Sequence, residues 1–215
     1  MSTRKLVGYH GTFEEHSESI LSDGFKPQVR NNHWLGQGTY FYTNKKLAHW
    51  WISKNSKTDP LKKKIKSKSV IIKAEIEEDT KKILDLDINE DIDLFFDCFK
   101  EYEPYLRRLH LSDNKHVNRC ACIDFLAEIF DWTVIKQTFE KDDHKPSYGK
   151  VDTIKFDSNI IPIDIHYKET QVCVRDQTCI KSKEIEYPDK EYNYPKKMRF
   201  DYKSNLGSDK YEEGC

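Results

Sequence analysis

The chain has 215 residues, of which 34% are charged, and its 36 basic and 37 acidic side chains leave a formal net charge of −1. This length suits one domain with its own hydrophobic core, and the balanced charge excludes a global field that would attract nucleic acids or membranes. No apolar run is long enough to span a bilayer and the start of the chain lacks a signal-peptide stretch, so we expect a cytoplasmic protein with free thiols.

The first predicted elements are a strand and a helix. An apolar run at residues 6–9 predicts the strand. Thr12 opens a Thr-x-x-Glu sequence typical of a capping box, which predicts a helix over residues 13–23 with Leu21 facing the interior. Gly24 can adopt the left-handed conformation that ends a helix, so we expect the helix to stop there.

An aromatic strand and a second helix follow. Residues 39–42 predict the strand, and residues 43–44 offer a capping side chain for the helix. That helix carries Trp50 and Trp51, at least one of which is expected to face the interior or a pocket. Residues 54–68 are strongly basic without hydrophobic periodicity, which predicts a surface loop whose lysines could also track nucleic-acid phosphates.

The later elements follow from hydrophobic patterning. Asp124 lies within a predicted buried helix and needs a partner there, and Arg175 is expected to pair with an acid. No strand and helix alternation is regular enough for a parallel sheet, so we expect an α+β domain over residues 1–185 and a polar tail over 186–215. Strands are predicted at 70–76, 83–86, 133–135, 153–156, 160–165 and 171–174, and helices around 94–99 and over 117–130.

Several residues near the start of the chain have the chemistry to bind a dinucleotide. His10 offers an imidazole to a ribose hydroxyl, and the missing side chain of Gly11 lets a planar amide approach the backbone. Gly38 belongs to a second Gly-x-Gly loop, while Tyr40 and Trp50 supply flat faces on which a nicotinamide ring can stack. Together these groups predict a concave, mostly apolar slot that suits a nicotinamide carboxamide.

These motifs resemble the NAD⁺-binding half of the ADP-ribosyltransferase superfamily, in its diphtheria-toxin and poly(ADP-ribose) polymerase branch. The resemblance is strong over about the first quarter of the chain. It implies an ADP-ribosyltransferase-like fold of split mixed and antiparallel sheets with flanking helices, and NAD as a co-substrate. The matching segments are Tyr9-His10-Gly11-Thr12, Ile20-Leu21-x-x-Gly24-Phe25, Gly36-x-Gly38-x-Tyr40-Phe41 and Ala48-x-Trp50.

The resemblance also implies roles for single residues. His10 would bind the adenosine ribose, and the backbone of Gly11 would bind the nicotinamide carboxamide. Tyr40 and Trp50 would sandwich the nicotinamide ring. Thr12 and Gly38 complete the expected cofactor-binding set, and no metal is expected.

The strand that begins with a catalytic glutamate in this branch carries Gln171 at the matching position. Breaking the glycosidic bond builds positive charge on the ribose, which a carboxylate stabilises and an amide does not. Glu169 lies two residues earlier, so on a strand it would face the same side and could supply the carboxylate. The order Glu169-x-Gln171 is the reverse of the Glu/Gln-x-Glu pair that other transferase branches use.

Three functions therefore remain open. The first is an NAD-dependent ADP-ribosyltransferase acting on a protein or nucleic acid, which would fit a toxin or defence effector. The second is a catalytically weak NAD or ADP-ribose binding module, in which Gln171 has replaced the acid. The third is an NAD glycohydrolase that uses water as the acceptor.

One further group of side chains could either bind a metal ion or pack in the interior. His110, His116, Cys120 and Cys122 lie close in sequence, but their spacing matches no familiar zinc pattern. On a helix Cys120 and Cys122 would point to different faces, so buried packing is favoured.

Overall fold

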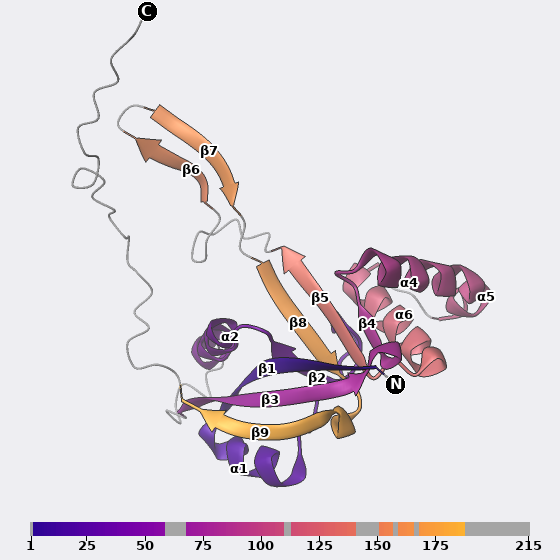
Figure 1. Cartoon of the computed structure of the whole chain (residues 1–215), viewed down its shortest axis with the longest axis horizontal. Coiled ribbons are helices and arrows are strands. Elements are labelled where there is room, and N and C mark those ends of the chain that lie inside the picture. The colour runs from indigo at the N-terminus through magenta and orange to yellow at the C-terminus, as the bar shows by residue number, and fades with distance from the viewer. Residues whose placement is uncertain are drawn as a thin grey trace, which may run out of the picture.

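The computed structural model describes residues 2–58, 68–109, 113–140, 151–156, 159–165 and 168–187, which form an α+β structure (Figure 1). The strands are β1 (Thr3–Phe13), β2 (Thr39–Tyr42), β3 (Ser69–Asp79), β4 (Ile83–Asp85), β5 (Val134–Glu140), β6 (Val151–Phe156), β7 (Asn159–Ile165), β8 (Lys168–Val174) and β9 (Ile180–Glu186). The helices are α1 (Glu14–Asp23), α2 (Lys45–Thr58), α4 (Asn89–Glu101), α5 (Glu103–Leu106) and α6 (Lys115–Phe130).

Seven strands form one mixed sheet in the order β4-β5-β8-β2-β1-β3-β9, and β6 pairs with β7 separately. Neighbouring strands are antiparallel except for β4 and β5, which are parallel. The predicted α+β class is therefore confirmed. Because sequence-distant strands lie side by side, the middle of the sheet brings together residues from both ends of the chain.

The sheet is nearly divided between β1 and β2. All eleven residues of β1 pair with β3, whereas β1 and β2 share a single register pair, Tyr9 with Tyr42. Beyond that pair the backbones of β1 and β2 no longer follow each other. The sheet thus consists of two hydrogen-bonded halves, β4-β5-β8-β2 and β1-β3-β9, that are joined at the pair Tyr9 and Tyr42. We call this pair the junction, and His10 follows it directly.

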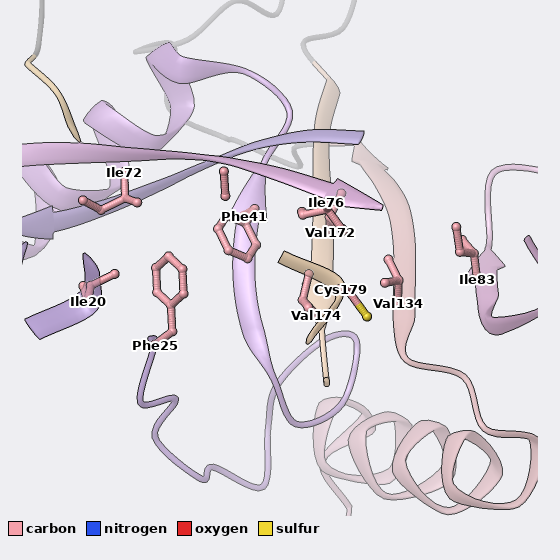
Figure 2. Packing of buried hydrophobic residues seen from close by; sticks show 11 residues of the cluster. Ile20, Phe25, Phe41, Ile72, Ile76, Ile83, Val134, Val172, Val174 and Cys179 are labelled. Atoms are coloured by element: carbon pink, nitrogen blue, oxygen red, sulfur yellow. The ribbon is translucent and has the colours of Figure 1, made fainter. Parts of the chain in front are cut away.

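One hydrophobic core lies on the face of the sheet that α1 covers. Phe25 and Phe41 form its centre, with ring centroids 5.1 Å apart in an edge-on arrangement (Figure 2). Alternate residues of a strand point to opposite faces, so the buried side chains recur at every second position of the strands. The core comprises Ile20, Phe25, Phe41, Ile72, Ala74, Ile76, Ile83, Val134, Val172, Val174 and Cys179.

A second core lies on the opposite face, against α4 and α6. Its members alternate with those of the first core along the same strands, as Cys173 does with Val172 on β8. Figure 1 shows α4, α5 and α6 gathered beside β4 and β5. The buried residues of this core are Leu35, Leu84, Cys98, Ile123, Leu126, Ala127, Trp132, Ile135 and Cys173.

The boundary between β1 and α1 differs from the sequence prediction. Thr12 belongs to β1 and is buried, and α1 begins at Glu14 without a side-chain hydrogen bond at its N-terminus, so the predicted capping box does not form. Pairing with β3 extends β1 to Phe13 and takes precedence over the local capping signal. Leu21 is 36% exposed rather than inward, because only one side of α1 faces the sheet.

Other local predictions are confirmed. The helix α1 ends at Gly24, which donates its N–H to the Ile20 carbonyl at 3.2 Å, although its φ of 89° and ψ of −178° are not those of the expected left-handed helical conformation. The Asn44 side chain accepts the Lys46 N–H at 2.9 Å at the start of α2. The structure contains the strands predicted from residues 70 and 83, which are β3 and β4. It also contains the buried helix predicted near residue 117, which is α6.

The basic segment and the tail are only partly described. Residues 54–58 continue α2 rather than forming a loop, while residues 59–67 lie outside the described ranges. Within the tail, Glu186 ends β9, and residues from 188 onward are not described. Among the helices described, none combines the length and the apolar character that crossing a membrane requires.

Candidate functional site

A hydrogen-bonded polar cluster on β8 and β2 forms the centre of the candidate site. The Gln171 Nε2 atom donates to the Glu169 Oε1 atom at 2.5 Å, so the predicted same-face arrangement of these side chains is confirmed. Tyr42 is the register partner of Gln171 and also hydrogen-bonds the Glu169 carboxylate. Burial, and then the nearby Glu169 charge, raises the pKa of Tyr42, which therefore stays protonated as a donor.

The Glu169 carboxylate is buried, and no cation pairs with it in the described part of the chain. The residue is 7% exposed, and among the described residues its hydrogen bonds come from the neutral groups of Tyr42 and Gln171, with no ion pair. A buried charge is costly unless an opposite charge or several donors compensate it. The burial and these hydrogen bonds make Glu169 a candidate for a functional carboxylate.

Tyr40 lies on the same face as this cluster but has a second role. Its hydroxyl accepts the Leu35 N–H at 2.7 Å and donates to the Gly36 carbonyl at 2.8 Å. Burial is the main cause that raises the pKa of this phenol. Tyr40 therefore fixes the loop before β2, and its half-buried ring packs against the His33 ring, with centroids 5.1 Å apart.

The Gly36-to-Gly38 loop is also anchored to α6 and β8. Asp124 accepts the Gln37 N–H at 2.7 Å and forms an ion pair with Arg175, which confirms the expectation of a partner for both charged residues. Gly36 has a φ of 77°, and a Cβ atom there would lie 2.5 Å from the Asp124 Oδ1 atom. The loop conformation thus depends on glycine and on the Asp124 carboxylate.

Two further glycines allow close backbone packing. A Cβ atom on Gly11 would lie 2.5 Å from the Ala48 carbonyl oxygen of α2, and one on Gly38 would lie 2.6 Å from the Val174 carbonyl oxygen. We expected space beside Gly11 for a planar amide. On the side where a Cβ atom would point, α2 fills that space. Gly11 could still contact a ligand through its backbone.

His10 occupies the junction between the two halves of the sheet. Its Nδ1 donates to the Tyr40 carbonyl at 2.8 Å, and its ring packs edge-on against Phe25 and Phe41 at 5.1 and 5.9 Å. Burial lowers the pKa of His10. Within the described ranges its Nε2 atom has no hydrogen-bond partner, so it remains a potential acceptor for a ribose hydroxyl.

The structure therefore brings only part of the predicted set together. Tyr40, Glu169 and Gln171 share one face of the central strands, whereas the His10 ring packs into the core on the other face. Thr12 is buried in β1, and Trp50 lies half-buried on α2. The neighbouring indole of Trp51 is more exposed, at 41%.

Sequence reasoning missed a cationic and aromatic group beside this cluster. Arg119 of α6 donates to the Gln137 Oε1 atom, and its guanidinium lies 5.2 Å from the centre of the Phe139 ring. Trp34 stacks on His116 at 5.6 Å and meets Phe139 edge-on at 4.7 Å. The sequence contained one indication of this group, because Arg119 is the single basic residue of the mostly apolar predicted helix over 117–130.

The described residues contain no group of three or more His, Cys, Asp or Glu side chains that could hold a metal ion. Cys120 is buried against the loop carbonyl of Arg30, and Cys122 is partly exposed, both as free thiols. His110 lies outside the described ranges.

Comparison with known proteins leaves the site as the main guide to function. No protein-family model matches the chain. The chain is 27% identical over 225 aligned residues to an uncharacterized protein of Methanocaldococcus jannaschii, covering 96% of this chain and 99% of that protein. The two chains therefore align over nearly their whole lengths, and the similarity carries no activity with it.

Proposed function

We propose that this protein is an NAD-dependent ADP-ribosyltransferase that cleaves nicotinamide from NAD⁺ and transfers ADP-ribose to a macromolecular acceptor. The observation that carries the proposal is the buried Glu169 carboxylate, held by two neutral donors on the face that also presents Tyr40. The sequence motifs around His10 and Tyr40 support the choice of NAD⁺.

The chemistry of bond cleavage explains why such a carboxylate is useful. As the bond between the ribose C1′ and the nicotinamide nitrogen breaks, nicotinamide leaves with the bonding electron pair and positive charge builds on the ribose. A carboxylate near that charge stabilises the transition state more than the ground state. Glu169 can supply this charge, while the Gln171 side-chain oxygen remains available to accept a ribose 2′-hydroxyl.

The other residues would bind and orient NAD⁺. The Tyr40 ring and Trp50 would hold the nicotinamide, with contributions from the backbones of Gly11 and Gly38. From the other face of the sheet, at the junction of its two halves, His10 would use its Nε2 atom as the hydrogen-bond acceptor for a hydroxyl of the adenosine ribose, and Thr12 lies at the same end of β1. Completion of the reaction requires an acceptor atom that bonds to C1′ and releases its proton to a base or to water.

Two alternatives remain, and a particular observation supports the first. Gln171 stands where the resemblance expects a catalytic glutamate, which favours an NAD or ADP-ribose binding module without turnover. An NAD glycohydrolase would use the same residues with water as the acceptor. A toxin or defence role would be consistent with either enzymatic activity.

Incubation with NAD⁺ labelled in the adenosine part separates these functions. We expect release of nicotinamide and transfer of label to a component of a cell lysate, digested separately with protease and nucleases to identify the acceptor class. Release without transfer would indicate a glycohydrolase. NAD⁺ binding without release would indicate a binding module. The absence of both NAD⁺ binding and nicotinamide release would rule out the proposal.

The role of Glu169 is tested with a matched pair of variants. Glu169→Gln is expected to slow nicotinamide release by roughly 100-fold, the order of effect seen when one transition-state electrostatic contact is removed. Glu75→Gln, on an exposed position of β3, serves as the control and should retain activity. Equal release rates for both variants would remove Glu169 from the mechanism.

A toxin or defence role has its own test. Expression of the wild-type protein in a bacterial host is expected to arrest growth, and His10→Ala or Tyr40→Ala should relieve the arrest. Arrest that persists in both variants at equal expression would show that the effect does not come from this site.

A further inference from the structure

Arg119 is a partly buried cation without a carboxylate partner in the described part of the chain. Its guanidinium donates to the neutral Gln137 side chain and lies over the Phe139 ring, and it forms no ion pair there. Burial lowers the pKa of Arg119, which reflects the cost of keeping the charge away from water. A planar guanidinium in this situation is well suited to bind a phosphate.

Aromatic side chains lie directly beside this cation. The Trp34 and His116 rings are nearly parallel, with an interplanar angle of 15°, and Trp34 also contacts Phe139. Trp34 is 38% exposed, although most large aromatic side chains pack inside. An exposed indole supported by a second ring is a platform on which a nucleic-acid base can stack.

The sheet places this platform next to the proposed reaction site. Gln137, which Arg119 contacts, is the direct register partner of Gln171. The strand order is β5-β8-β2-β1, and the strand residues assigned to NAD⁺ lie on β8, β2 and β1. Arg119 and Phe139 therefore lie on the β5 side of Gln171. The residues assigned to the adenosine lie on its other side, toward β1.

We propose that Trp34, Phe139 and Arg119 form the acceptor-binding site, and that the acceptor is a single-stranded nucleic acid. The inference rests on the proposed transferase function. A base stacks on Trp34 while Arg119 binds a backbone phosphate. A folded protein acceptor fits less well, because the site combines one cation with flat aromatic faces rather than an extended apolar patch.

Binding is tested without NAD⁺, so that its outcome does not depend on turnover. Short fluorescein-labelled RNA and DNA single strands of mixed sequence are titrated with the full chain, and fluorescence anisotropy is recorded. We expect saturable binding that Trp34→Ala weakens by about tenfold, as expected for the loss of one stacked base. Arg119→Gln should weaken binding and lower the slope of log affinity against log salt by about one.

Matched controls separate the site from general effects of substitution. Trp51→Ala removes an indole of similar exposure from α2, and Arg107→Gln removes an exposed arginine from the end of α5. Both controls should bind as the wild type does, and thermal unfolding checks that all variants are folded.

Three results would overturn the inference. They are the absence of oligonucleotide binding, equal affinities for the site variants and the controls, and preferential binding of a polyglutamate peptide. Nicotinamide release is measured in parallel on the wild type. Release without oligonucleotide binding would reject this acceptor alone, whereas Trp34-dependent binding without release would retain the site and reject the transferase function.

Discussion

Glu169 and Asp85 are both buried carboxylates of the same sheet, at 7% and 1% exposure, but their charges are balanced differently. Asp85 on β4 forms ion pairs with Arg4 at 2.8 Å and with Lys136 at 2.9 Å. Glu169 on β8 has only neutral donors among the residues described. Cations of the protein compensate the Asp85 carboxylate, whereas the described part of the chain supplies no cation to Glu169.

The comparison separates residues that hold the fold from residues available for function. A paired buried charge becomes costly when its partner is lost, because the remaining charge stays away from water. An unpaired buried charge already carries that cost, so removing it is tolerated. Stability measurements on isosteric variants therefore distinguish the two roles without an assay of activity.

The largest effect on stability is expected for Asp85→Asn. The change leaves Lys136 and Arg4 beside a neutral amide, although Asp87 still contacts Lys136 at 2.6 Å. We expect the free energy of unfolding to fall by about 3 kcal/mol. Urea denaturation measures this value, with Asp97→Asn as an exposed control. A fall below about 1 kcal/mol would remove the contrast with Glu169.

A smaller loss is expected for Tyr40→Phe, which removes a hydroxyl bonded to the backbone of Leu35 and Gly36. Because the buried N–H of Leu35 loses its acceptor, the free energy of unfolding should fall by about 1–2 kcal/mol. Tyr105→Phe, at an exposed position of α5, is the control. If the two variants were equally stable, Tyr40 would be free of this structural role and present only to bind a ligand.

The dependence of stability on pH sharpens the assignment of His10. Its pKa is lowered by burial, so the unfolded chain takes up a proton before the folded protein does. The contribution of His10 to the free energy of unfolding is fully present above the pKa of about 6.5 in the unfolded chain, and it is lost as the pH falls below that value. His10→Asn should therefore show a shallower loss of stability between neutral and acidic pH.

The control for this experiment is His16→Asn, because His16 is exposed on α1. The control should keep the wild-type pH dependence, including the part that comes from His33, whose pKa burial also lowers. Parallel curves for His10→Asn and the wild type would contradict a buried, neutral imidazole at the junction of β1 and β2.

The smallest change in stability is expected for Glu169→Gln. The amide can keep the hydrogen bonds from Tyr42 and Gln171 while removing the uncompensated charge. We expect the free energy of unfolding to stay within about 1 kcal/mol of the wild type or to rise. A loss comparable to that of Asp85→Asn would make Glu169 a structural residue.

Local patterns in the sequence determined several features of the fold and the site. The apolar run from Val70 predicted β3, and Gly24 predicted the end of α1. The two-residue period of a strand correctly placed Glu169 and Gln171 on one face. These features depend on neighbouring residues alone, which is why they could be predicted.

Only the tertiary structure decided which distant groups meet. Ala48 of α2 occupies the space beside Gly11, and Arg175 of the chain's last third compensates Asp124. Gln137 brings Arg119 beside Gln171 because β5 pairs with β8. Strand pairing and helix packing set these contacts between residues far apart in the chain. The sequence by itself thus determined that the site contains a carboxylate beside an amide, and the tertiary fold decided that, among the residues described, neutral donors rather than a cation meet this carboxylate.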